Sequence, residues 1–259
     1  MLHYTQFVLH KDAQWVTFIH GAGGSSAIWF KQIRDFRKQH NVLLVDLRGH
    51  GKSKFPLGKQ LKKYRFDTLG DEVMEVLDHL NIERSHFVGI SLGTIMIREL
   101  ADRYPDRVQS MILGGAVMKL NVRGQLLMRM GVLLKSIVPY ILLYKLFAFV
   151  IMPRKNHRDS RNMFINEARK LYQKEFKRWF ALASQVNPLL SVFRINDPGI
   201  PTLYVMGSED HMFLPTISQL VKNHKSSQLE VIHQCGHVVN IEQPAAFNRL
   251  TLKFLQSMA

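Results

Sequence analysis

The stretch "HFVGISLGT", residues 86–94, places an apolar strand pattern directly before a serine with glycines on both sides. Gly89, Ser91 and Gly93 have the spacing G-x-S-x-G. After a strand and before a helix, this spacing predicts a sharp turn that exposes the serine, because glycines leave room where the strand and helix pass close together. The spacing alone is weak evidence, since a glycine-flanked serine is also found as an ordinary helix N-cap. The surrounding sequence therefore has to decide between the two.

Short apolar and β-branched runs alternate with helical patterns on both sides of this stretch. The predicted strands are residues 15–20, 42–47, 86–90, 111–116, 202–207 and 229–234. The predicted helices are residues 26–38, 67–80 with Asp67 as N-cap, 92–104, 215–224, and 244–257 with Pro244 in the first turn. Near-continuous apolar strands suit a sheet covered on both faces. The alternation predicts an α/β fold with a doubly wound, mostly parallel sheet.

The interval 118–198 contains no strand pattern and is too long for an ordinary connection. We expect a helical cap here, inserted after the strand that follows the helix opened by Ser91, with residues 1–117 and 199–259 forming the α/β core. Residues 131–155, "GVLLKSIVPYILLYKLFAFVIMPRK", are apolar, but two lysines and Pro139 leave no run of about 20 apolar residues that could span a membrane. We expect this stretch to form a roof over Ser91.

Two further cap helices show amphipathic patterns. In the first, the polar residues Gln125, Arg129, Lys135 and Ser136 fall on one face, away from Leu126, Met130, Leu133 and Leu134. A later helix, about residues 161–183, sets an apolar side against a basic side; the apolar residues are Phe164, Ala168, Leu171, Phe176, Trp179 and Phe180. This helix is expected to pack on the body with a solvated basic face. A compatible hypothesis is that its apolar side also lines an acyl pocket.

Positive charge is concentrated in the cap. The chain of 259 residues has a net charge of +15, and residues 119–194 hold seven Lys and eight Arg against three acidic residues. This charge suits an anionic substrate or peripheral contact with an anionic membrane surface. No nucleic-acid-reading module accompanies it, so nucleic-acid binding is not expected. The single cysteine and the charged N-terminal residues, which do not resemble an export signal, lead us to expect a cytoplasmic protein.

Three further motifs follow predicted strands. "HGAGGS", residues 20–25, is a glycine-rich turn whose backbone N–H groups could face an oxyanion. "GSEDHMF" contains Asp210, and "GHVVNIEQP" contains His237. A serine hydroxyl needs a base to take its proton, and that base needs a carboxylate to fix its tautomer. The chain order serine, aspartate, histidine is the order of one hydrolase architecture.

Together with "DLRGHGKS", these motifs make the chain resemble the α/β-hydrolase-fold serine hydrolases, of the carboxylesterase and lipase-like kind, from residue 20 to 244. The resemblance implies that Ser91 is the nucleophile, His237 the general base and acid, and Asp210 the orienting carboxylate. It also implies an oxyanion hole formed by the backbone N–H groups of Ala22 and Leu92. No cofactor and no metal are expected. Thr94 stands where the family commonly has glycine.

Several nearby residues compete for these roles. Glu209 adjoins Asp210, but the second acid of "GSED" is the one that matches the family pattern. Asp46, His20 and His50 are expected to order loops. Cys235 is interpreted as a small buried residue.

The expected activity is hydrolysis of a hydrophobic carboxylic ester with a medium or long acyl chain, through an acyl-enzyme at Ser91. One alternative keeps the three residues but acts as a C–C hydrolase or lyase on a carboxylated ring, or as a cofactor-free perhydrolase. A second alternative is a ligand-sensing or binding protein that signals through movement of the cap. Fold alone does not choose among these activities.

Overall fold

A mostly parallel sheet forms the centre of the molecule. The computed structural model describes residues 1–54, 63–134 and 137–258. The sheet of the described residues has seven strands in the order β1-β3-β2-β4-β5-β6-β7, and only the β1–β3 pair is antiparallel. The strands are β1 Tyr4–Phe7, β2 Trp15–Ile19, β3 Asn41–Val45, β4 Ser85–Ile90, β5 Val108–Gly114, β6 Thr202–Gly207 and β7 Ser227–Ile232. The predicted fold class is confirmed.

The sequence analysis missed β1. This strand has the sequence "YTQF", and all four of its residues are partly or fully exposed. It lies at the edge of the sheet, where one side has no neighbour and a continuous apolar run is not required. The predicted inner strands agree with the observed ones within about three residues at each end.

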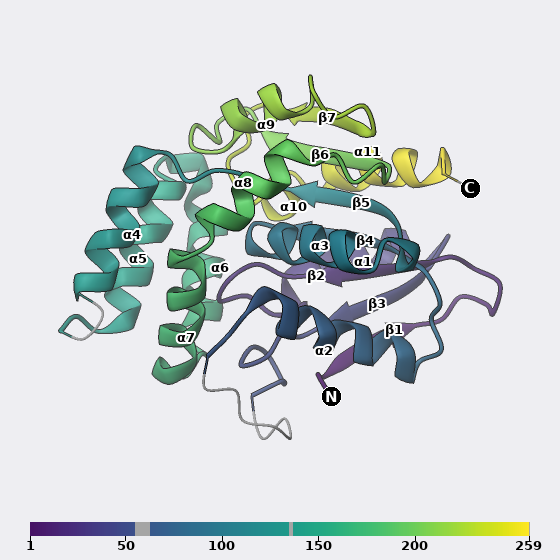
Figure 1. The fold of residues 1–259 in the computed structure, drawn as a ribbon, viewed down its shortest axis with the longest axis horizontal. Helices are drawn as coiled ribbons and strands as arrows, with labels where there is room; N and C mark the ends of the chain where they lie inside the picture. The colour runs from purple at the N-terminus through teal and green to yellow at the C-terminus, as the bar shows by residue number, and fades with distance from the viewer. Residues whose placement is uncertain (55–62, 135–136, 259) are drawn as a thin grey trace.

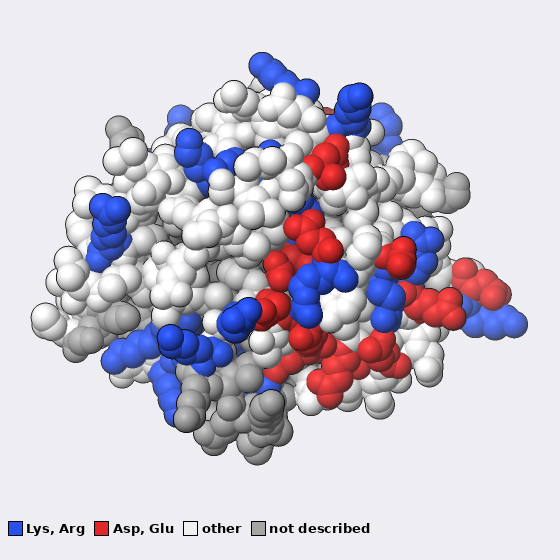
Figure 2. Space-filling view, in the orientation of Figure 1, with Lys and Arg blue, Asp and Glu red and all other residues white. Residues whose placement is uncertain are grey.

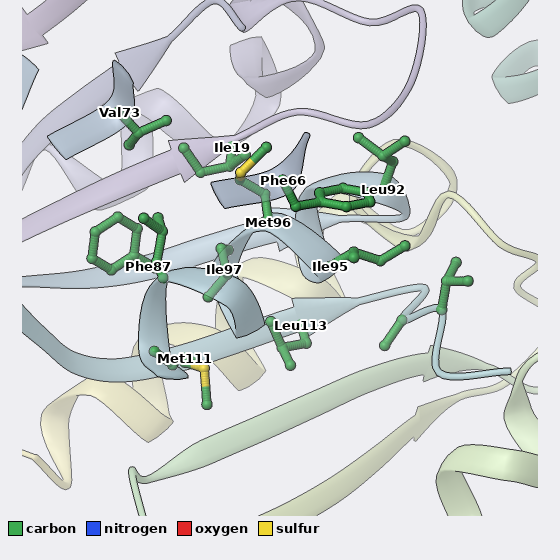
Figure 3. Packing of buried hydrophobic residues seen from close by; sticks show 14 of the residues in the cluster. Ile19, Phe66, Val73, Phe87, Leu92, Ile95, Met96, Ile97, Met111 and Leu113 are labelled. Carbon is green, nitrogen blue, oxygen red and sulfur yellow. The ribbon is translucent and has the colours of Figure 1, made fainter. Parts of the chain in front are cut away.

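Helices cover both faces of the sheet. One face holds α1 Phe30–Phe36, which follows a 3₁₀ turn at Ser26–Trp29, and α11 Pro244–Gln256. The other face holds α2 Phe66–His79, α3 Leu92–Arg103 and α9 Leu214–Leu220. Figure 3 shows this second interface, where side chains of α2 and α3 meet those of the strands; the labelled ones are Ile19, Phe66, Val73, Phe87, Leu92, Ile95, Met96, Ile97, Met111 and Leu113.

Pro244 occupies the first position of α11, as predicted, whereas the N-cap predicted for α2 is wrong. The N-cap is Arg65, which makes no side-chain capping hydrogen bond, and Asp67 lies in the first turn. The helix begins one residue earlier than expected because Phe66 is buried in the core. A short helix, α10 Val239–Glu242, was also not predicted.

Every element that the structure describes between β5 and β6 is helical, and we call these helices the cap. They are α4 Val122–Leu134, α5 Tyr140–Ile151, a 3₁₀ turn at Lys155–His157, α6 Arg158–Ala168, α7 Gln173–Ser184 and α8 Asn187–Ile195. The single helix expected over 161–183 is therefore two helices. The bend between them contains no proline or glycine, so no local signal marks it. Figure 1 shows α4 to α7 together at the end of the molecule toward which the arrow of β5 points.

The structure turns the predicted apolar face of α4 to solvent. Leu126, Met130 and Leu133, which were predicted to lie away from Gln125 and Arg129, are exposed. Arg129, predicted on the opposite face, is also exposed; Lys135 and Ser136 lie outside the described residues. In the described part of the chain no helix is both long enough and apolar enough to cross a membrane.

The sheet brings two of the sequence motifs together. After β2 the chain moves to β3 on one side, and β4 then lies on the other side of β2. The carboxyl ends of β2 and β4 are therefore a topological switch point, where open α/β sheets bind ligands. The turn after β2 contains residues 20–25, and Ser91 directly follows β4.

Candidate active site

Ser91 lies in a strained turn between β4 and α3. Its backbone has φ 53° and ψ −120°, a conformation that costs a non-glycine residue roughly 1–3 kcal/mol. The neighbouring glycines are required by space: a Cβ at Gly89 would lie 2.5 Å from Cδ1 of Ile97, and a Cβ at Gly93 would lie 2.3 Å from the carbonyl oxygen of Ile19. The turn therefore has the geometry that the G-x-S-x-G spacing predicts.

Thr94 supports this turn. Its hydroxyl donates a hydrogen bond of 2.6 Å to the carbonyl oxygen of Ser91 and accepts one of 3.3 Å from the backbone N–H of Val117. A glycine at this position, as is common in the family, could make neither bond. The departure from the family pattern thus ties the turn to the segment that leads into the cap.

The structure brings Ser91, His237 and Asp210 into one hydrogen-bonded chain. His237 Nε2 lies 2.9 Å from Ser91 Oγ, and His237 Nδ1 lies 2.7 Å from Asp210 Oδ2. The side chains of His237 and Asp210 are almost fully buried. Asp210 Oδ1 also accepts the backbone N–H of Phe213, whose ring packs 5.1 Å from the imidazole. This geometry suits transfer of the Ser91 proton to His237.

Glu209 points away from this chain of hydrogen bonds. Its carboxylate binds Asn156 Nδ2 at 2.8 Å, His157 Nε2 at 2.7 Å and Arg154 Nη1 at 2.5 Å, all at the junction between α5 and α6. The hydrogen bond from Asn156, with those from His157 and Arg154, lowers the pKa of Glu209. Glu209 joins the cap to the loop that carries Asp210, and it does not contact His237.

Two backbone N–H groups next to Ser91 are free to bind an oxyanion. Among the described residues, the N–H groups of Ala22 and Leu92 have no protein acceptor. Both residues border the same cavity as Ser91. Leu92 is the first residue of α3, so its N–H has no intrahelical partner and lies at the positive end of the helix dipole.

His20 and His50 shape the turn that contains Ala22. His50 Nε2 accepts the backbone N–H of Gly23 at 3.0 Å, and His20 Nε2 accepts that of Leu47 at 3.0 Å. Burial lowers the pKa of His20. The pKa of His50 lies well below its ordinary value because of burial and, to a smaller extent, the nearby His20. Both rings are therefore neutral near pH 7, which leaves each one the lone pair that these hydrogen bonds require.

Asp46 orders the same region without contacting Ser91. Its carboxylate accepts the backbone N–H of Ser26 at 2.7 Å and that of Lys52 at 2.9 Å, so it links the turn after β2 to the loop after β3. Cys235 is fully buried, and burial raises its pKa. No group of three or more His, Cys, Asp or Glu side chains within the described ranges is arranged to hold a metal ion.

An apolar cavity of about 170 Å³ lies above Ser91, between the sheet and the cap. Its floor contains Ser91, His237, Ala22 and Leu92. Its walls and roof are almost entirely apolar, with lining residues that include Ile95, Val117, Met128, Tyr144, Phe147, Ile151, Phe164, Leu171, Phe176, Trp179, Phe180 and Phe213. Three residues of the predicted roof stretch 131–155 are in this set.

One residue of the site carries no sequence signal. Tyr144, from α5, donates a hydrogen bond of 2.5 Å from its hydroxyl to the carbonyl oxygen of Ala22. Burial raises the pKa of Tyr144 well above its ordinary value, so the hydroxyl stays protonated as a donor. Two more bonds join the cap to the loops below: Ser25 Oγ donates to Glu167 at 2.8 Å, and Trp179 Nε1 donates to the Arg48 carbonyl at 2.9 Å.

A sharp serine turn at the switch point of a parallel sheet, with a histidine and an aspartate on later loops, defines the α/β hydrolases. The family model described as alpha/beta hydrolase fold matches residues 14–244, and the chain belongs to this family and is a hydrolase. A 3-oxoadipate enol-lactonase of Acinetobacter baylyi is 30% identical over 259 residues, covering 95% of this chain and 90% of that protein.

Solved structures agree on the fold. A hydrolase from Pseudomonas aeruginosa superposes with a TM-score of 0.82 at 22% identity, covering 97% of this chain and 93% of the other. An enol-lactonase from Burkholderia xenovorans superposes with a TM-score of 0.80 at 21% identity, covering 98% and 96%. At these identities the likeness defines the architecture and leaves the substrate to the residues of this chain.

Proposed function

We propose that the protein is a serine hydrolase that cleaves neutral, hydrophobic carboxylic esters through an acyl-enzyme at Ser91. The observation that carries this proposal is the position of the Ser91–His237–Asp210 chain at the floor of an apolar cavity, beside two free backbone N–H groups. The names of relatives, which include a lactonase and carboxylesterases, support ester-type bonds as the target.

The reaction follows from the geometry. His237 Nε2 takes the Ser91 proton while Oγ attacks the ester carbonyl carbon, and Asp210 stabilises the charged imidazole through Nδ1. The N–H groups of Ala22 and Leu92 bind the oxygen that becomes negative. The C–O bond to the alcohol then breaks, and His237 returns the proton to the leaving oxygen. Water attacks the acyl-enzyme in the second half, again with His237 as base.

The lining of the cavity supports a neutral substrate. His237 is the only ionisable side chain that lines it besides Tyr144, and among the described residues no Lys or Arg does so. A carboxylate buried there would have no cation to pair with, which is costly in an apolar site. This argues against the alternative in which the same triad acts on a carboxylated ring.

The size of the cavity supports a medium acyl chain. A cavity of about 170 Å³ is slightly larger than the roughly 150 Å³ apolar cavity that holds benzene. A longer chain would have to extend past Leu120 and Met128, which also line a groove of about 490 Å³ at the surface. We therefore expect activity to rise from acetyl to medium acyl esters.

Labelling with a fluorophosphonate probe tests the nucleophile, and a panel of nitrophenyl esters from acetyl to palmitoyl tests the substrate class. Ser91→Ala and His237→Ala should abolish labelling, and the exposed Ser257→Ala should label like the wild type. An unlabelled wild-type protein would contradict the acyl-enzyme. Labelling without turnover of any ester would favour the C–C hydrolase, perhydrolase or ligand-sensing alternatives.

Two further expectations stay proposals. We propose that residues 118–198 form a cap that is structurally distinct from the core of residues 1–117 and 199–259, and the run of helices between β5 and β6 supports this division. We also propose peripheral contact between the basic cap and an anionic membrane surface. The charge supports it, since residues 119–194 have 15 basic and three acidic residues.

A further inference from the structure

The solvent-facing sides of α4 and α5 carry an unusual number of large apolar side chains. On α4, Val122, Leu126, Met130 and Leu133 follow one another at intervals of four, four and three residues, so they form a single stripe along the helix. Val122 is 81% exposed and Leu133 is 76% exposed. We call this stripe, together with the exposed residues Leu142, Leu146 and Phe149 of α5, the cap ridge.

The two halves of the ridge lie on neighbouring helices. A Cβ at Gly131 of α4 would lie 2.9 Å from the ring of Phe147 of α5, so the helices pack closely at this glycine. Figure 1 shows α4 and α5 at the end of the molecule opposite to α11. Single exposed apolar residues are normal on a protein surface, whereas a continuous row of them at an outer edge marks an interaction surface.

The charged residues on the two ridge helices are basic. The sequence contains no acidic residue from Arg107 to Arg158, and the exposed Arg129 and Lys145 lie on α4 and α5. The guanidinium of Arg161 lies 5.4 Å from the centre of the Phe149 ring. On the face shown in Figure 2, acidic atoms gather around α2 and the core, and none is visible over the end that α4 and α5 occupy.

Apolar side chains surrounded by basic ones match the surface of an anionic bilayer. The apolar groups enter the boundary between head groups and acyl chains, and the long basic side chains reach the lipid phosphates. A second copy of this chain fits the ridge less well, because it would bring two equally basic surfaces together. We propose that the cap ridge docks on an anionic lipid surface.

Docking through the ridge would place the surface groove next to the lipid. Leu133 belongs to the ridge and also lines the groove of about 490 Å³, which shares the lining residues Leu120 and Met128 with the cavity above Ser91. An acyl ester could then pass from the bilayer to Ser91 along α4. This route rests on the proposed ester hydrolysis, whereas the docking does not. The docking surface is the apolar side of α4 and α5, so the proposed contact is more specific than the overall charge of the cap.

Vesicle co-sedimentation of the full chain tests the docking. The wild type should bind vesicles of equal parts phosphatidylcholine and phosphatidylglycerol and should not bind phosphatidylcholine alone. The double variant Leu126→Ser/Leu133→Ser should lose at least about tenfold in affinity. The matched control is Val8→Ser/Ile195→Ser, which removes one apolar side chain near β1 and one from α8. Val8 and Ile195 are 58% and 78% exposed, compared with 58% and 76% for Leu126 and Leu133. It should bind like the wild type.

Different results would overturn the lipid docking and the proposed ester hydrolysis. Absence of wild-type binding, or an equal loss in the ridge and control variants, would overturn the docking. A dimer in analytical ultracentrifugation that the ridge variant dissociates, without vesicle binding, would instead identify a second copy as the occupant. Ser91→Ala should bind vesicles like the wild type. If it binds and the wild type hydrolyses no ester, the docking stands and only the proposed function fails.

Discussion

The floor and the roof of the cavity above Ser91 are held by different forces. The floor consists of strand ends and loops whose polar groups are fixed by hydrogen bonds, such as the bond of 2.7 Å between His237 and Asp210 and that of 2.9 Å between His237 and Ser91. The roof consists of helices whose aromatic side chains pack on each other; the rings of Phe176 and Phe180, for example, are stacked. This difference supports the proposal that the floor carries the reaction and the roof selects the substrate.

The strongest test of this assignment concerns two neighbouring acids. Asp210→Asn should lower kcat by about 10⁴-fold, because an amide no longer stabilises the charged imidazole or fixes its tautomer. Steady-state kinetics on a medium acyl ester measures the effect. Glu209→Gln is the matched control, since its carboxylate contacts cap residues and does not contact His237.

The control should change kcat by less than tenfold. If Glu209→Gln were as inactive as Asp210→Asn, the triad acid would depend on the cap, and the separation of floor from roof would be wrong. Equal activity of Asp210→Asn and the wild type would remove Asp210 from the triad altogether.

A second test uses pH to probe the sheet below the floor. His86, on β4, is fully buried between Ser110 Oγ at 2.7 Å and Gln14 Oε1 at 3.1 Å. Burial, with a smaller effect of His40, lowers its pKa to about 4. The unfolded chain takes up this proton near pH 6.5, while the folded protein resists it until about pH 4. The stabilisation is therefore complete above pH 6.5 and is lost as the pH falls toward 4.

The free energy of unfolding should fall by about 3 kcal/mol between these pH values through His86 alone, at roughly 1.4 kcal/mol for each pH unit. Denaturant titrations at several pH values measure it. His86→Gln should flatten the dependence, and the exposed His233→Gln should keep the wild-type slope. An unchanged slope in His86→Gln would show that this histidine does not govern the acid stability of the sheet.

The same contrast explains how much the sequence could predict. In the core, residue 93 has to be glycine because a Cβ there would collide with the carbonyl oxygen of Ile19. The backbone geometry of the turn therefore determines a residue that can be recognised in the sequence. The serine turn could be predicted for this reason, and the inner strands could be predicted from their apolar runs. The roles of Ser91, His237 and Asp210 stay predictions, although their side chains lie within hydrogen-bonding distance of one another. The edge strand β1 was not predicted, because its sequence "YTQF" is only partly buried and lacks a continuous apolar run.

In the cap, the sequence predicts helices but not their orientation. Periodicity shows that α4 has an apolar face, yet nothing in it says whether that face meets the body or the solvent. The exposure of Leu126 and Leu133 could therefore not be predicted. The bond from Tyr144 to the Ala22 carbonyl joins residues 122 positions apart and depends on how α5 docks. Such contacts are decided by packing between helices, which carries no local motif.

A third test enlarges a side chain of the roof. Met128 lines both the cavity and the surface groove, so Met128→Trp should reduce the space that a long acyl chain can occupy beside it. The value of kcat/KM should fall about tenfold for a long acyl ester and stay unchanged for the acetyl ester. Met130→Trp is the matched control, because Met130 lies on the exposed side of the same helix.

The assays should contain no detergent, and both esters should be used at concentrations at which they stay dissolved. Docking on lipid then does not contribute to the measured rates. An equal loss for long and short esters in Met128→Trp would indicate damage to the floor, and the proposed acyl path would then be wrong.

The smallest expected effect comes from the hydrogen bond between Tyr144 in the roof and the carbonyl oxygen of Ala22. Tyr144→Phe removes the donor to the Ala22 carbonyl and keeps the ring that stacks on Phe164. Because the turn is also held by His50 through Gly23, we expect only about a fivefold fall in kcat with KM nearly unchanged. Tyr140→Phe is the control on the same helix, since its hydroxyl binds the Leu171 carbonyl at 2.9 Å, away from Ser91. Equal effects of the two variants would mean that Tyr144 only stabilises the cap, whereas a selective fall in kcat would make the roof a positioning element for the reaction below it.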